Sequence, residues 1–93
     1  MKQKETRQLR ELYSVGPATV RDLKTLGITR VEQLVGKDAQ KLYDRLGRLA
    51  GKRYDPCMMD VLSAAIAQAQ DPNLPKEKRK WWYWSRIRKS RRQ

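Results

Sequence analysis

Hydrophobic residues recur every three or four positions along most of the chain, and proline, glycine or aspartate residues separate the segments in which they do so. No segment within residues 1–70 alternates apolar and polar positions as a half-buried strand does. The pattern therefore predicts an all-α fold, a compact bundle of about five short helices that occupies residues 1–72. The expected helices cover approximately residues 4–13, 17–26, 30–35, 39–50 and 56–70.

Residues that favour helix ends mark several of these boundaries. Asp38 and Asp55 can each accept a hydrogen bond from a backbone amide at the start of a helix, and Pro17 has the fixed φ of a first helical position. Gly51 can take the left-handed conformation that ends the preceding helix. Asp71 precedes a proline and is pushed out of the helical region, so the last helix of the bundle stops there.

The charge of the chain is positive and unevenly distributed. Its 93 residues include 22 Lys and Arg against 10 Asp and Glu and no histidine, which gives a formal net charge of +12. Residues 76–93 hold nine basic residues and one acid, so this short stretch carries most of the excess. Like charges at this density repel one another unless a polyanion or solvent screens them. We therefore expect residues 73–93 to form a second unit, a basic C-terminal segment that is partly helical and favours nucleic acid.

The residue types present argue against an enzyme. A chain of this length does not enclose a deep substrate cavity, and without histidine it has neither His/Cys zinc ligand sets nor the His-dependent pairs of nucleophilic catalysis. Asp22, Asp55 and Asp60 are interpreted as caps and solvated helix charges rather than metal ligands. The sequence thus predicts no enzymatic activity, no cofactor, no metal and no small-molecule substrate.

The single cysteine, Cys57, has two interpretations. The simpler one is a small buried residue in the first turn of a helix. The alternative is a reactive thiol, because a helix N-terminus and the nearby cations Lys52 and Arg53 can lower a thiol pKa.

Hydropathy bears on the cellular location. No apolar run is long enough to span a bilayer, and the first residues lack the apolar stretch of a secretory signal, so we expect a cytoplasmic protein. A membrane surface is the least favoured partner, although a basic, aromatic segment is compatible with a lipid headgroup layer.

Residues 9–28, LRELYSVGPATVRDLKTLGI, resemble the helix-hairpin-helix motif, with Ser14-Val15-Gly16 as the tight turn. The sequence departs from the motif at Ser14, where the motif usually has glycine, and at Val20, where it usually has alanine. The resemblance implies contact with a DNA backbone that does not depend on base sequence. The implied nucleic-acid-binding residues of the hairpin, with the amides of Gly16 and Ala18 as donors, are Ser14, Gly16, Ala18, Arg21 and Lys24.

A longer resemblance covers residues from about 9 to 84. The chain is similar there to a family of small bacterial helix-hairpin-helix proteins known as pathogenicity-locus or mitomycin resistance proteins. Three blocks carry the likeness, and they are Val15-Gly16-Pro17-Ala18 with Asp22-Leu23 and Leu26-Gly27-Ile28, Asp55-Pro56-Cys57-Met58 with Asp60-Val61, and Lys80-Trp81-Trp82-Tyr83-Trp84. The resemblance implies a fold and a role at DNA, and no defined biochemical activity.

The basic C-terminal segment combines cations with a cluster of four aromatic residues. If this segment is helical from Pro75, then Trp81, Trp84 and Ile87 share a face that can dock on the bundle, whereas Trp82 points elsewhere. The tryptophans complete a small core in one interpretation and stack on exposed bases in another. The cations predicted to contact phosphates are Lys78, Arg79, Arg86, Arg88 and Lys89.

Two functions remain in competition. The leading one is a non-enzymatic, largely sequence-independent nucleic-acid binder, in which the hairpin and the basic C-terminal segment contact the phosphate backbone of DNA. The alternative is a protein-interaction adaptor, in which the bundle and Trp81, Trp82 and Trp84 engage a protein partner.

Overall fold

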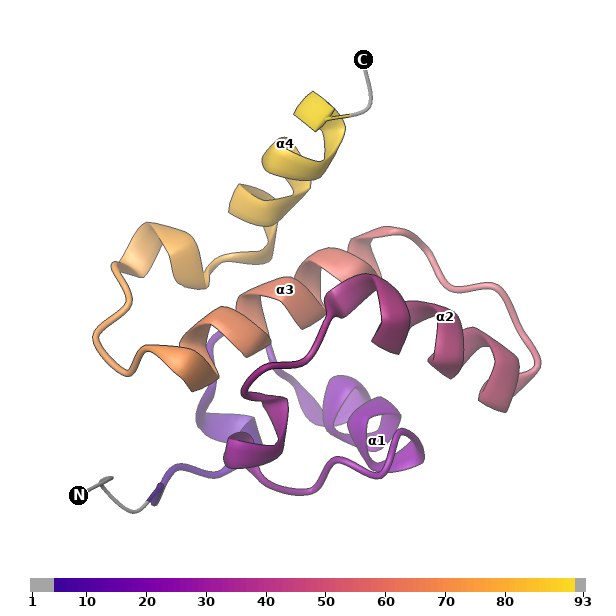
Figure 1. Ribbon diagram of the computed structural model, residues 1–93, viewed down its shortest axis with the longest axis horizontal. Coiled ribbons are helices and arrows are strands. Elements are labelled where there is room, and N and C mark those ends of the chain that lie inside the picture. The colour runs from indigo at the N-terminus through magenta and orange to yellow at the C-terminus, as the bar shows by residue number, and fades with distance from the viewer. Residues whose placement is uncertain (1–4, 92–93) are drawn as a thin grey trace.

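The computed structural model describes residues 5–91, which form four α-helices and three short 3-10 helices with no β-strand among them (Figure 1). The predicted all-α class is therefore confirmed for this part of the chain. In chain order the elements are η1 (Leu9–Glu11), α1 (Pro17–Thr25), η2 (Val31–Leu34), α2 (Ala39–Ala50), α3 (Cys57–Gln70), η3 (Lys76–Arg79) and α4 (Trp81–Arg91).

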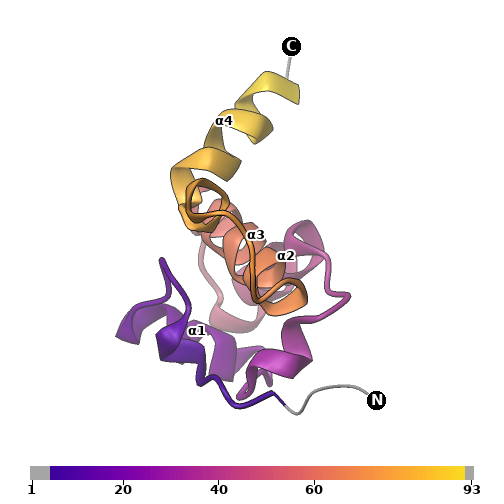
Figure 2. The same cartoon turned by 90° about the vertical axis from the view of Figure 1, so that its left-hand side faces the viewer.

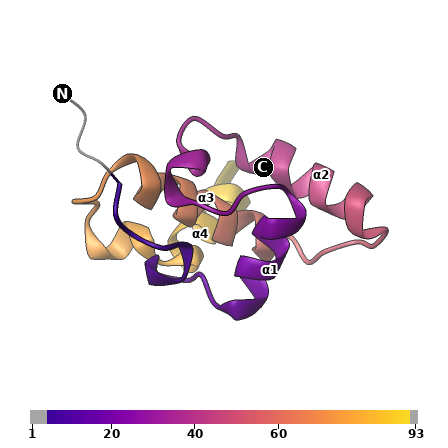
Figure 3. The same ribbon diagram turned by 90° about the horizontal axis from the view of Figure 1, so that it is seen from below.

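The helix α3 lies at the centre of the structure. It contacts α2, α4, η2 and η3, and two perpendicular views place α4 on one side of it and α1 on the other (Figures 1 and 2). Four alanines and a single charged residue make its sequence suitable for burial from several directions. Viewed from below, α1 is in front and α4 lies behind α3 (Figure 3). The largest completely buried apolar side chains around this centre are Leu23, Val31, Leu34, Leu46 and Leu62.

The bounds of three predicted helices agree with the structure to within one residue. Asp38 Oδ1 accepts a hydrogen bond from Lys41 N at 3.1 Å, and Asp55 Oδ1 accepts one from Cys57 N at 2.8 Å, so both aspartates cap the helices that follow them. Gly51 ends α2 with a φ of 66°. The segment predicted over 30–35 is a shorter 3-10 helix, Val31–Leu34.

The prediction of a helix over residues 4–13 is wrong for the described part of that range, and Lys4 lies outside the described residues. Only a 3-10 turn forms, because Gln8 and Leu12 on either side of it have extended backbone conformations. Long-range contacts hold the chain in this form. Arg7 Nη1 donates to the carbonyl oxygen of Gln68 at 3.0 Å, and the Gln68 side chain bonds to the backbone of Tyr13.

A buried ion pair attaches α4 to α3. The Arg88 guanidinium donates to both carboxylate oxygens of Asp60, at 2.9 and 3.0 Å, and Asp60 is only 1% exposed. The interpretation of Asp60 as a solvated helix charge is therefore wrong.

The basic C-terminal segment is not one continuous helix from Pro75, since extended backbone at Lys80 separates η3 from α4.

Membrane insertion through a helix finds no support within residues 5–91. None of the helices there combines the length with the apolar composition needed to cross a bilayer.

Removal of the Arg88 side of the ion pair tests this attachment. Arg88→Met should lower the free energy of unfolding by about 3 kcal/mol or more, because it leaves the Asp60 carboxylate buried without a partner. Urea unfolding followed by circular dichroism measures the change. Lys89→Met removes the same charge from an exposed neighbouring position and should have an effect within about 0.5 kcal/mol. Equal effects of the two substitutions would contradict the structural role of the pair.

Candidate nucleic-acid interface

The N-terminus of α1 is open to solvent and has no side-chain cap. Gly16 occupies the capping position, which a glycine cannot fill with a hydrogen-bonding side chain, and no acidic residue lies in the first turn. Gly16, Pro17 and Ala18 are all exposed. The amides of Gly16 and Ala18 donate to no acceptor among residues 5–91. Free amides and the positive end of the helix dipole therefore coincide at this surface.

The other three α-helices differ from α1 in this respect. Asp38 caps α2, Asp55 caps α3, and the Ser14 hydroxyl accepts a hydrogen bond from Trp81 N, the first amide of α4, at 3.3 Å. An anion approaching α2 or α3 would meet a carboxylate that already occupies the position. Among the described α-helices, the chemistry for binding an anion is therefore best at α1.

The turn before α1 is held in place from both sides. Ser14 has a φ of 71°, the left-handed conformation that a glycine would adopt easily. Its hydroxyl donates to the carbonyl oxygen of Arg79 at 3.3 Å in addition to accepting from Trp81 N. Val15 is buried in the core. The turn therefore presents Gly16 outward while Ser14 faces the C-terminal segment.

Two cations lie farther along α1 from its open end, with Lys24 in the last turn of the helix. Arg21 and Lys24 are exposed on α1, whereas Leu23 between them is completely buried. Asp22 is half-buried and its Oδ1 accepts a hydrogen bond from the Tyr54 hydroxyl at 3.3 Å. The one acid of α1 is thus directed toward the body of the protein, and the exposed charges of this helix are positive.

The five cations predicted in the C-terminal segment divide into two groups. Lys78, Arg86 and Lys89 are exposed and available to a ligand. Arg79 Nε donates to the carbonyl oxygen of Leu74 at 2.7 Å, and the charge of Arg88 is neutralised by Asp60. The structure therefore does not bring all five to one accessible surface, and the C-terminal end of α4 points away from α1 (Figures 1 and 2).

The aromatic cluster is divided in the same way. Trp82 is 43% exposed, as its position in the helix predicted, and the Lys80 ammonium lies 5.4 Å from the centre of its ring. Trp81, Tyr83 and Trp84 are half-buried, and Trp84 Nε1 donates to the carbonyl oxygen of Lys78 at 2.8 Å. Most of the cluster therefore serves the packing of α4.

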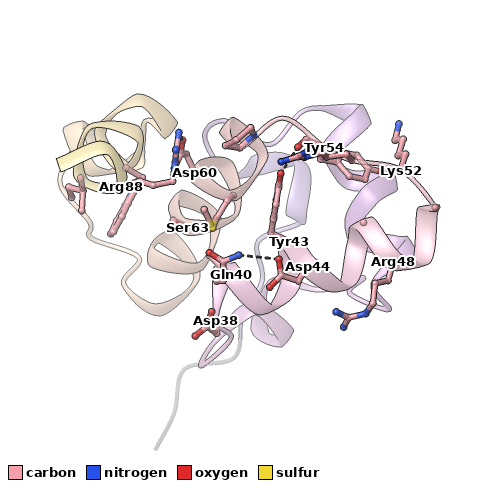
Figure 4. Close-up of a pocket in the computed structure, with 18 residues that line it drawn as sticks. Asp38, Gln40, Tyr43, Asp44, Arg48, Lys52, Tyr54, Asp60, Ser63 and Arg88 are labelled. Atoms are coloured by element: carbon pink, nitrogen blue, oxygen red, sulfur yellow. Dashed lines mark hydrogen bonds and ion pairs between the residues drawn. The ribbon is translucent and has the colours of Figure 1, made fainter. Parts of the chain in front are cut away.

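An open groove of about 1240 Å³ separates α2 from α4, with α3 as its floor (Figure 4). Tyr43 from α2, Met59 from α3 and Trp84 from α4 are among its lining residues, and Asp60 and Arg88 lie beside each other at one wall. No pattern in the sequence indicates this groove. Helical periodicity locates the faces of α2 and α4, but the groove depends on the angle at which α4 docks.

Comparison with known proteins places the chain in a family. A sequence profile described as Pathogenicity locus (Cdd1) matches residues 2–90, nearly the whole chain. The protein belongs to the pathogenicity-locus family. Over 81 residues it is 37% identical to a protein of Streptomyces lavendulae called mitomycin resistance protein McrB, an alignment that covers 87% of this chain and 73% of that protein. No solved structure matches the chain significantly.

The thiol of this pathogenicity-locus family member lies in an environment that does not activate it. Cys57 is half-buried at the start of α3. A hydrogen bond to the Asp55 carboxylate, followed by burial, raises the pKa of the thiol, although the Arg88 guanidinium acts in the opposite direction. The interpretation of Cys57 as a thiol with a lowered pKa is therefore wrong, and the helix N-terminus is already occupied by Asp55.

Alkylation measures this effect. At pH 8, iodoacetamide should label Cys57 more slowly in the folded protein than in urea, because less of the folded thiol is ionised. Asp55→Asn removes the negative charge and should accelerate labelling of the folded protein several-fold. Cys57 labelling that is faster in the folded wild type than in the unfolded chain would contradict the raised pKa.

Proposed function

We propose that this protein binds nucleic acid, DNA in particular, without catalysing a reaction and largely without regard to base sequence. The open N-terminus of α1 is the observation that carries the proposal. There, the exposed amides of Gly16 and Ala18 would donate to a backbone phosphate, and Arg21 and Lys24, farther along the helix, would meet neighbouring phosphates. Lys78, Arg86 and Lys89 would contribute more diffuse neutralisation of phosphates.

The conformation of the turn supports the resemblance to a helix-hairpin-helix motif. Ser14 adopts the backbone conformation that the glycine of the motif would have, so this departure from the motif leaves the turn tight. The second departure, Val20, lies on α1 and is half-buried against the core. The first element of the hairpin is the 3-10 turn η1 rather than a full helix. The proposal depends on the turn and on α1, both of which are in place.

The net charge of +12 also favours a polyanionic partner for this chain. The printed name of the relative, a mitomycin resistance protein, states no reaction and is compatible with a protein that acts by binding.

The dependence of binding on salt tests the proposal. Affinity for a 20-base-pair duplex should fall steeply with salt concentration, because each phosphate contact releases counterions. Arg21→Gln/Lys24→Gln should reduce the slope of log affinity against log salt by about 1.8, since each contact contributes about 0.9. Fluorescence anisotropy measures both quantities. Absence of duplex binding at low salt would contradict the proposed function.

A substitution at Gly16 separates function from stability. The φ of −97° and the free space around this glycine allow a side chain. Gly16→Asp should cap α1 and leave the free energy of unfolding unchanged or a few tenths of a kcal/mol higher. It should nevertheless weaken duplex binding about tenfold, or by about 1.4 kcal/mol, because a carboxylate then occupies the phosphate position. Gly16→Asn adds a cap without charge and should lose less affinity. Equal binding by wild type and Gly16→Asp would place the phosphate elsewhere.

A protein-interaction adaptor is the second candidate function. The exposed Trp82 and the groove between α2 and α4 favour it, because both offer apolar contact area to a partner helix. The adaptor becomes the preferred function if the protein shows no affinity for DNA at low salt.

A further inference from the structure

Three cations line up along one face of α2, and the last of them, Arg48, also borders the groove between α2 and α4. Lys41, Arg45 and Arg48 are spaced by four and three residues, which places them on one face of the helix. All three are exposed, and the exposed Lys52 follows directly after the helix ends at Gly51. We refer to these four residues as the α2 basic face.

No acidic partner neutralises this face within the described part of the chain. The three ion pairs among residues 5–91 involve none of its members. The exposed Asp44 is four residues before Arg48 and borders the same groove, and its Oδ1 accepts a hydrogen bond from Gln40 Nε2 at 3.0 Å (Figure 4). Asp38 is engaged in capping the helix.

Helix stability accounts for only part of the α2 basic face, because Asp44 is one acid that faces both Lys41 and Arg48 at helical spacing. Like charges three or four residues apart destabilise a helix by a few tenths of a kcal/mol per pair. The helix dipole favours a cation in the last turn, where Arg48 lies, but it disfavours Lys41 in the first turn. A ligand that carries several negative charges would remove the repulsion.

The composition of the face indicates the class of ligand. None of its four members is aromatic, and the Tyr54 ring beside Lys52 is half-buried and covered by the Lys52 ammonium, so its contacts would be mainly with phosphates. A double-stranded nucleic acid presents a regular array of phosphates and shields its bases. The face is therefore better suited to a duplex than to a single strand.

The location of the face connects it to the proposed interface at α1. The helix α1 packs against α2, and Lys52 Nζ lies 4.6 Å from the centre of the Tyr54 ring, whose hydroxyl donates to Asp22 on α1. The C-terminal end of α4, in contrast, points away from α1 (Figure 1). Of the two cationic surfaces, the α2 basic face is the closer neighbour of α1.

We propose that the α2 basic face forms a second set of backbone contacts with double-stranded DNA. This inference rests on the proposed function and adds that the DNA is a duplex and that α2, rather than α4 alone, extends the contact beyond α1.

The test compares two variants that lose the same charge. Lys41→Gln/Arg45→Gln should reduce the slope of log duplex affinity against log salt by about 1.8. Arg10→Gln/Lys37→Gln removes two exposed cations that belong neither to the α2 basic face nor to the other proposed contacts, and should change the slope much less. Lys41→Arg/Arg45→Lys keeps the charge and should bind as the wild type does. Thermal unfolding of each variant checks that the fold is intact.

Three results would overturn the inference, and they are distinguishable from failure of the proposed function. In the first, Arg21→Gln/Lys24→Gln lowers the slope while Lys41→Gln/Arg45→Gln does not, so that α1 binds DNA without α2. In the second, the wild type binds a single strand of the same sequence more tightly than the duplex. In the third, the α2 variant loses affinity for anionic phosphatidylglycerol vesicles but not for DNA. Complete absence of DNA binding by the wild type would remove both proposals.

Discussion

The pairing of polar side chains on the central helix α3 is the constraint on which the rest of the structure depends. Gln68 and Asp60 are buried on this helix, where an unsatisfied amide or carboxylate would be strongly destabilising. The Gln68 amide accepts from Tyr13 N and donates to the Tyr13 carbonyl oxygen, and Asp60 receives two hydrogen bonds from Arg88. Two segments far apart in the sequence, the turn before α1 and the helix α4, are thereby attached to one element.

This attachment determines which helix end remains free. Because the turn is held on α3, the Ser14 hydroxyl faces the C-terminal segment and caps α4, not the helix that it precedes. The capping position of α1 is Gly16, two residues later, which has no side chain and leaves the amides of α1 exposed. The open end of α1 and the capped end of α4 therefore lie on either side of one turn.

The cations of the chain serve two different purposes that composition does not distinguish. Arg7, Arg79 and Arg88 donate hydrogen bonds to groups of the protein itself and stabilise the fold. Arg21 and Lys24, together with the α2 basic face, are exposed without an acidic partner in the described region. Positive charge available to a polyanion is therefore found on α1 and α2 as well as in the C-terminal segment. The distribution of Lys and Arg along the sequence predicts it mainly in the C-terminal segment.

The sequence by itself determined α1, α2 and α3, their caps at Asp38 and Asp55, and the exposure of Trp82, because helical periodicity and capping depend on neighbouring residues. It also located the turn at Ser14 and the exposed cations of α1, Arg21 and Lys24. Only the tertiary structure decided that η1 is not a longer helix, that Asp60 is buried, and that a groove separates α2 from α4. These features arise from contacts between residues far apart in the sequence, such as Asp60 and Arg88, which are 28 residues apart. No local sequence pattern identifies such partners.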